Sequence, residues 1–227
     1  MRTITIPWQM WYGTTLDISL PESWETTVAQ MRGGADIGEE GIRRAFADPI
    51  GAPPLREVAS GRKNAAIVID DISRPTPSYR ILPYILEELE AGGIGEDNII
   101  VIVATGAHRA FRREDWVRKI GQELTDRLDI RSHNPTENLD FYGTSSQGAP
   151  IWINRDFAHA DLRIGAGMIM PRGRGYGGGS KIVLPGISGR ETIYVRSAER
   201  RLSPVDHRQV RFCVHRCRFS CRRRAAF

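Results

Sequence analysis

Two short apolar runs constrain the fold of this chain more than any other feature of its sequence. Ala65–Ile69 and Ile99–Ala104 are rich in β-branched residues and lack the polar alternation of a half-exposed strand. A helical pattern runs from Tyr79 to Ala91 between them, and a second one, from Trp116 to Leu128, follows. Continuous apolar strands that alternate with helices predict an α/β fold, in which a parallel-rich sheet is flanked by helices and covered on both faces.

Weaker patterns predict five more elements. Thr3–Pro7 and Thr15–Leu20 alternate in the manner of two strands of a half-buried sheet. Glu39–Ala47 has helical spacing, whereas Ala149–Ile153 and Leu162–Gly165 resemble further strands. We expect residues 1–199 to form one α/β domain.

The charge of the chain is unevenly distributed. The net charge of +5 arises from residues 200–227, which hold nine Arg and one Asp, so that residues 1–199 have a net charge of −3. The body therefore gives no reason to expect nucleic-acid binding. No apolar run approaches the roughly 20 residues of a membrane span, and the first twenty residues lack the apolar core of a signal peptide. We expect a cytoplasmic protein without a membrane partner.

The basic tail at 200–227 also holds all three cysteines, Cys213, Cys217 and Cys221. Together with His215 they suggest a metal cluster, but their spacing is not that of a zinc site. The arginines suggest a nucleic-acid site, but no aromatic platform accompanies them. A solvated basic helix is a further alternative. We favour a disordered or frame-shifted segment, because the usage of Cys and Arg changes abruptly there.

Polar clusters follow both apolar runs. Asp70 to Arg74, with Asp71, Ser73 and Arg74, come after the first run, and Thr105 to Arg109, with His108, come after the second. Ligands of parallel sheets gather beyond the carboxyl ends of the strands, so we expect both clusters to line one pocket. Arg offers a planar fork for phosphate or carboxylate, Asp and Ser can hold ribose hydroxyls, and His can act as a general acid or base.

Each cluster also has a purely structural interpretation. Ser73 could cap a helix whose first turn contains Pro75, with Asp71 and Arg74 paired to each other. His108 could be a surface or core histidine whose hydrogen bonds are satisfied by the backbone. The residues alone leave both alternatives open.

A glycine-rich run ends in Lys181, one of only three lysines among 32 basic residues. Such a run permits close backbone approach to a ligand, and the lysine could be a phosphate partner or a nucleophile. It is not a Walker A loop, since Ser180 precedes the lysine and Ile182 follows it. A flexible surface loop is the structural alternative.

Three motifs follow one another in the sequence. They are Asp71-x-Ser73-Arg74-Pro75-x-Pro77, Ala104-Thr105-Gly106-x-His108-Arg109, and Gly175-Tyr176-x-Gly178-Gly179-x-Lys181 followed by Leu184-Pro185-Gly186. In this order they resemble the nickel-dependent lactate racemase family over roughly residues 1–197. The resemblance implies a Rossmann-like N-terminal domain of a lactate-racemase-like protein, an isomerase.

The resemblance also implies definite chemistry. The cofactor of the family is a nickel pincer nucleotide, derived from pyridinium-3,5-bisthiocarboxylate mononucleotide and tethered through a lysine that matches Lys181. Asp71, Ser73 and Arg74 match the cofactor-nucleotide contacts. His108 matches one of two catalytic histidines, which take the hydroxyl proton of a 2-hydroxy acid while hydride passes to the cofactor and returns on either face.

The sequence departs from the family pattern at two histidines. Pro171-Arg172 stands where the family has its second catalytic histidine, and guanidinium cannot act as a base in its place. Ser197 stands where the family has its nickel-ligand histidine, and His207 is ten residues too late to be equivalent. We therefore assign no metal ligand in this chain.

The chain is also about half as long as the family enzymes. We expect that it lacks the second domain, that a separate chain could supply a C-terminal domain as partner, and that turnover by the chain alone is small or absent. A non-catalytic nucleotide- or phosphate-binding domain is the alternative function. A fragment without a stable fold is a third possibility.

Overall fold

The structure is a computed structural model that describes residues 1–8, 13–29, 34–146, 148–172 and 175–195. Contacts between Cα atoms divide the chain into two units, Met1–Ile42 and Arg43–Phe227. The basic tail at 200–227 lies outside the described residues, so its boundary and its predicted disorder stay predictions.

The first unit contains an antiparallel hairpin of strands β1 (Arg2–Trp8) and β2 (Thr14–Leu20). Its register places Ile4 opposite Ile18, and both side chains are half-buried. On the other face the hydroxyl of Thr5 donates to the carboxylate of Asp17. The two strands and their polar alternation are as the sequence predicts. Helix α1 (Gly38–Ala47) follows and spans the boundary between the units.

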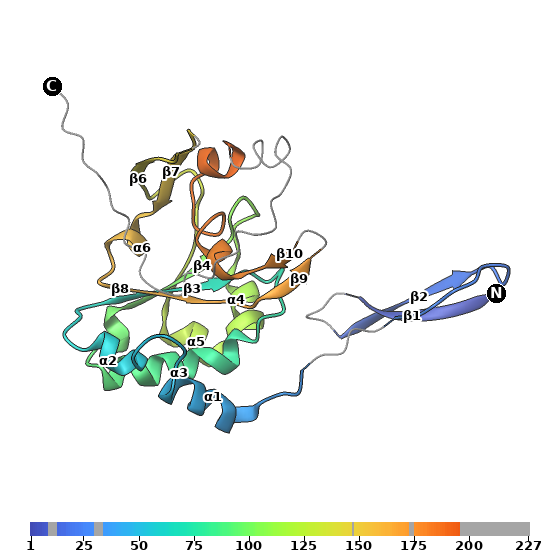
Figure 1. Ribbon diagram of the computed structural model, residues 1–227, viewed down its shortest axis with the longest axis horizontal. Coiled ribbons are helices and arrows are strands. Elements are labelled where there is room, and N and C mark those ends of the chain that lie inside the picture. Colours follow the sequence, from blue (N-terminus) through green and yellow to red (C-terminus); the bar gives the residue numbers. More distant parts are fainter. Residues whose placement is uncertain (9–12, 30–33, 147, 173–174, 196–227) are drawn as a thin grey trace. The chain divides into compact units, whose positions relative to one another are not determined.

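The second unit is built on a four-stranded sheet in which every neighbouring pair is parallel (Figure 1). The strand order is β5-β4-β3-β8, and the strands are β3 (Ala65–Asp70), β4 (Ile99–Ala104), β5 (Asp129–Ser132) and β8 (Leu162–Ala166). The chain runs outward from β3 through β4 to β5 and then returns to the other side of β3. The switch point of this Rossmann-like order lies between β3 and β8.

Both faces of the sheet are buried, which explains the continuous apolar runs. Ile67 and Ile69 of β3 pack on one face with α2 (Leu55–Ala59), α3 (Ser78–Ala91), α4 (Arg113–Ile120) and α5 (Gln122–Arg127) (Figure 1). Val68 and Ile102 pack on the other face. Their partners there come from β6 (Leu139–Thr144), β7 (Pro150–Asn154), α6 (Arg155–His159) and the segment around Ile187. The predicted parallel-rich α/β fold is confirmed.

One detail of the prediction is wrong. The pattern from Trp116 to Leu128 is not one helix, because Gly121 has a φ of +90° and separates α4 from α5. The strand predicted at Ala149–Ile153 is confirmed as β7, which pairs with β6 in a separate antiparallel ribbon.

The remaining elements are short. The 3-10 helix η1 (Glu96–Asn98) precedes β4, and β9 (Met170–Arg172) pairs with β10 (Gly175–Gly177) before the 3-10 helix η2 (Gly179–Ile182). Among the described residues, no helix combines the length and the apolar character that a bilayer crossing requires.

Candidate functional site

An open cavity of about 330 Å³ lies where strands β3, β4 and β8 end. Asp70 ends β3 and Asp71 follows it, Ala104 ends β4 and Thr105 to His108 follow it, and Gly167 and Met168 follow β8. The cavity therefore occupies the switch point of the sheet, the place where parallel α/β folds bind ligands. Its other wall is formed by the glycine-rich segment, including Gly178, Lys181 and Gly186.

The turn after β3 is organised around the carboxylate of Asp71, which is 3% exposed. Its Oδ1 accepts a hydrogen bond from the backbone N–H of Ser73 at 2.9 Å and another from the Ser73 hydroxyl. The backbone N–H of Arg74 donates to the carbonyl of Asp71 at 3.0 Å. Asp followed by Ser forms this kind of turn readily, because both side chains can bond the nearby backbone.

His108 is joined to the same carboxylate. Its Nδ1 lies 2.5 Å from Oδ2 of Asp71, and its side chain is 56% exposed. A buried carboxylate that bonds Nδ1 fixes the ring orientation and its tautomer, so that Nε2 is the nitrogen left to exchange a proton with a ligand. The structural interpretation of the first cluster paired Asp71 with Arg74. In the structure, Asp71 pairs with His108 instead.

The loop that presents His108 is held at both ends. The hydroxyl of the buried Thr105 donates to the carbonyl of His133 at 2.8 Å. Beyond His108, the guanidinium of Arg109 donates to both carboxylate oxygens of Asp115, at 2.8 and 3.0 Å. These hydrogen bonds keep the pKa of Asp115 below its usual value although burial opposes the shift.

His133 itself is a buried structural histidine. Its Nε2 lies 3.0 Å from the carbonyl of Ser188, and burial lowers the pKa of the ring. The neutral ring therefore donates to that carbonyl and ties the end of β5 to the segment that follows Gly186.

The glycine-rich segment approaches the sheet through its main chain. The N–H of Gly106 donates to the carbonyl of Gly186 at 2.8 Å, which links the His108 loop to this segment. A Cβ atom on Gly186 would lie 2.0 Å from the carbonyl oxygen of Ile182, and one on Gly178 would lie 1.7 Å from that of Met168. Both positions therefore require glycine, and the interpretation of this run as a flexible surface loop does not describe the segment from Gly178 onward.

The structure thus brings together four of the five predicted site residues. Asp71, Arg74, His108 and Lys181 all line the cavity. Ser73 does not line it; this side chain is exposed, and its hydroxyl supports Asp71. These four residues therefore lie around one cavity, and the role of each of them stays a prediction.

One residue of this region was not predicted from the sequence. Lys119 of α4 forms an ion pair at 2.7 Å with Asp70, which lines the cavity as its place in the first polar cluster predicts. The available signal was Lys119 itself, a lysine between Trp116 and Ile120 on the apolar stripe of its helix.

Other predicted features lie at the edge of the described chain or beyond it. The backbone of Pro171 and Arg172 belongs to β9, and their side chains are outside the described part. Ser197, His207 and the three cysteines also lie outside it. Within the described ranges, no group of three or more His, Cys, Asp or Glu residues is placed to hold a metal ion.

A family model identifies the chain. Residues 12–202 match the lactate racemase N-terminal domain. The chain belongs to this family. The match covers most of the sequence, including all three motifs and the cavity that they surround.

Curated lactate racemases are similar to this chain over the same region. The lactate racemase of Thermoanaerobacterium thermosaccharolyticum is 32% identical over 201 residues, which cover 85% of this chain and 46% of the relative. The lactate racemase of Lactiplantibacillus plantarum is 32% identical over 183 residues, which cover 76% of this chain and 43% of the relative. The chain therefore spans about half the length of these lactate racemases.

Two solved structures share the fold of this chain. The lactate racemase apoprotein from T. thermosaccharolyticum superimposes with a TM-score of 0.68 at 29% identity, over 85% of this chain and 45% of that one. A protein of Thermotoga maritima superimposes with a TM-score of 0.57 at 24% identity, over 68% of this chain and 39% of that one, which shows a shared fold. The chain is a lactate-racemase-like N-terminal domain.

Proposed function

We propose that this chain forms the cofactor-binding and proton-transferring half of a 2-hydroxy acid racemase or epimerase. The observation that supports the proposal best is that Arg74, His108 and Lys181, from three distant parts of the sequence, line one cavity at the switch point of the sheet. Its volume of about 330 Å³ lies within the range of small-molecule sites.

The described residues fit a nickel pincer nucleotide. Arg74 would bind the phosphate, because a guanidinium matches two phosphate oxygens at once. Lys181 would supply the amine for the covalent tether, and the main chain at Gly178 and Gly186 leaves no room for a side chain to intrude. Ser197 stands where the family has its nickel-ligand histidine, so the proposal assigns no nickel ligand to this chain. The chemistry that such a group supplies when bound is reversible acceptance of hydride from carbon 2 of the substrate.

His108 would move the proton of the reaction. The imidazole would take the hydroxyl proton of the 2-hydroxy acid on Nε2 and later return it, while Asp71, at 2.5 Å from Nδ1, would stabilise the imidazolium. Racemisation needs hydride to return to either face of the substrate carbon, and the family uses one histidine for the hydroxyl proton of each enantiomer. Pro171-Arg172 replaces the second histidine of the family, so this chain supplies one base.

The remainder of the catalytic unit would come from elsewhere. The curated relatives are about twice as long as the matched region, and we propose that a separate C-terminal domain completes the cleft and contacts the small-molecule substrate. We place the protein in the cytoplasm.

The test is covalent loading. The chain is co-expressed with the enzymes that make the cofactor, and the intact protein and its peptides are weighed by mass spectrometry. We expect an adduct on Lys181 that Lys181→Ala abolishes and that the exposed Lys63→Ala retains. An unmodified wild-type protein, or an adduct on Lys63, would contradict the proposal.

A non-catalytic nucleotide- or phosphate-binding domain is a second candidate. The replacement of the second histidine by Pro171-Arg172 favours it, because such a domain needs Arg74 and the glycine segment but no pair of bases. It predicts that a mononucleotide binds in calorimetry without nickel, and that Arg74→Ala weakens binding whereas His108→Ala does not.

A further inference from the structure

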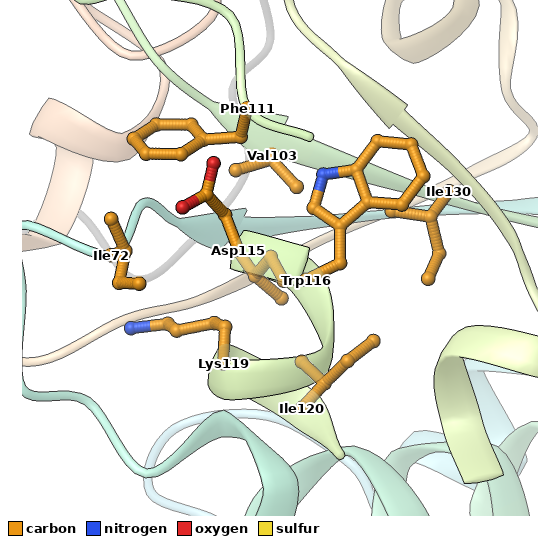
Figure 2. Close-up of a pocket in the computed structure, with 9 residues that line it drawn as sticks. Ile72, Val103, Phe111, Asp115, Trp116, Lys119, Ile120 and Ile130 are labelled. Carbon is orange, nitrogen blue, oxygen red and sulfur yellow. The ribbon is translucent and has the colours of Figure 1, made fainter. Parts of the chain in front are cut away.

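Lys119 is a deeply buried basic side chain close to the cavity. Its side chain is 3% exposed, and it belongs to the inner face of α4. The side chain lines a small cavity of about 10 Å³, together with Ile72, Trp116, Ile120 and Ile130 among others. Figure 2 shows the side chain stretched out from α4, with its nitrogen on the side of Ile72 and away from Trp116 and Ile130.

The ammonium group contacts Asp70 and Arg74, the residues at the two ends of the turn after β3. It forms an ion pair with Oδ1 of Asp70 at 2.7 Å and donates a hydrogen bond to the backbone carbonyl of Arg74 at 2.9 Å. Asp70 also accepts a hydrogen bond from the hydroxyl of Thr76. Asp70 and Arg74 both line the cavity, whereas Lys119 lies behind them.

Stability alone is a weak reason for this arrangement. Burial of an ammonium group carries a large desolvation cost, and replacement of a buried ion pair by apolar residues is often neutral or stabilising. The same burial lowers the pKa of Lys119, although Asp70 opposes the shift. What the ion pair does provide is a fixed main-chain position for Arg74, whose own side chain is half-buried and bonds to the adjacent Ser73.

We propose that Lys119 is a positioning residue, which holds the backbone of Arg74 and the carboxylate of Asp70 so that the Arg74 guanidinium meets the phosphate of a bound mononucleotide. The inference rests on the proposed function for the identity of the ligand. It adds a residue from α4, outside the three motifs, to the site.

The first measurement reports how firmly the turn from Asp71 to Arg74 is held in the absence of a ligand. Hydrogen exchange of the Ser73 and Arg74 amides is compared in the wild type, in Lys119→Met, and in Arg118→Met, which removes a positive charge from the exposed side of the same helix. We expect exchange at these two amides to be about tenfold faster in Lys119→Met and unchanged in Arg118→Met. If Lys119→Met unfolds, Lys119→Met combined with Asp70→Asn removes both charges of the buried pair and takes its place.

The second measurement is the affinity for nicotinic acid mononucleotide, a pyridine mononucleotide, by calorimetry on the full chain. We expect Lys119→Met to weaken binding about tenfold and Lys119→Arg to restore part of it. In a protein that already contains Arg74→Ala, Lys119→Met should have no further effect, because its influence passes through Arg74. A merely structural role would lower affinity equally in both backgrounds.

The outcomes separate the two proposals. Binding in the wild type with unchanged affinity and unchanged amide exchange in Lys119→Met overturns the positioning role and leaves the proposed function intact. A wild-type protein that binds no mononucleotide overturns the inference, whereas the proposed function stands or falls separately with the adduct on Lys181. Additive effects of Arg74→Ala and Lys119→Met also overturn the positioning role.

Discussion

The two segments that face each other across the cavity are built in opposite ways. The turn from Asp71 to Arg74 is held by side chains, since a buried carboxylate bonds Ser73 and His108, and Lys119 bonds the Arg74 carbonyl. The segment from Gly178 to Gly186 is held by its main chain, which approaches other carbonyls so closely that a Cβ atom would collide with them. The first segment depends on charge and the second on the absence of side chains.

This difference predicts different responses to change. Substitutions in the glycine segment should act through sterics and cost stability at every pH. Substitutions around the strand-end loops should act through hydrogen bonds and ionisation, so their effects should depend on pH or appear mainly in binding. Three experiments test this contrast.

The largest effect is expected for Gly186→Ala. The new Cβ would lie 2.0 Å from the Ile182 carbonyl oxygen and 2.9 Å from the Ala104 Cβ, so the backbone must move and the bond from the Gly106 N–H must weaken. We expect a loss of about 3 kcal/mol or more in the free energy of unfolding, measured by urea denaturation. Gly95→Ala is the control, because nothing lies within 4 Å of its Cβ position. Equal stabilities of the two variants would show that the glycine segment is not sterically constrained.

The core of the fold was predictable because its signals are local. Strands β3 and β4 are apolar on both faces, and strand ends in such a sheet must meet at one edge, which is why Asp71, Arg74 and His108 could be placed together. Edge strand β5 was missed because it is short and its side chains alternate between buried and exposed, as in Ile130 and Arg131.

Other features depended on contacts that a sequence does not display. The break between α4 and α5 follows from the positive φ of Gly121, and a single glycine in a helical pattern does not predict such a conformation. The ion pair of Lys119 with Asp70 joins residues 49 positions apart in the chain. The need for glycine at Gly186 arises from the carbonyl of Ile182, which closes on it in the folded turn.

An intermediate, pH-dependent effect is expected for Asp115→Asn. The Asp115 carboxylate accepts two hydrogen bonds from Arg109 and one from the N–H of Arg112 at 3.0 Å, and these bonds lower its pKa in the folded protein. Because the pKa of Asp115 is lower in the folded than in the unfolded protein, the ionised carboxylate stabilises the fold at every pH above its unfolded pKa. This stabilisation is lost as the pH falls through the pKa of Asp115 in the folded protein. We expect Asp115→Asn to cost about 1–3 kcal/mol at pH 7.

The sign of the pH dependence distinguishes this site from the glycine segment. The difference between wild type and Asp115→Asn should shrink as the pH is lowered below about 4, whereas the deficit of Gly186→Ala should persist. Urea denaturation at pH 7 and pH 3 measures both, with the exposed Asp97→Asn as a control for general charge effects. A deficit of Asp115→Asn that stays constant with pH would mean that packing, and not ionisation, explains the contribution of Asp115.

The smallest effect on stability is expected for Arg74→Ala. The guanidinium bonds to the neighbouring Ser73, and the hydrogen bond from Lys119 goes to the backbone carbonyl, which the substitution retains. We therefore expect the free energy of unfolding to change by less than about 0.5 kcal/mol, while affinity for the pyridine mononucleotide falls at least about tenfold. Such a separation would show that the turn is built by Asp71 and Lys119 and that Arg74 is presented by it for binding. If Arg74→Ala instead destabilised the protein as much as Asp115→Asn does, the guanidinium would be part of the framework, and the division of this turn into framework and ligand contact would be wrong.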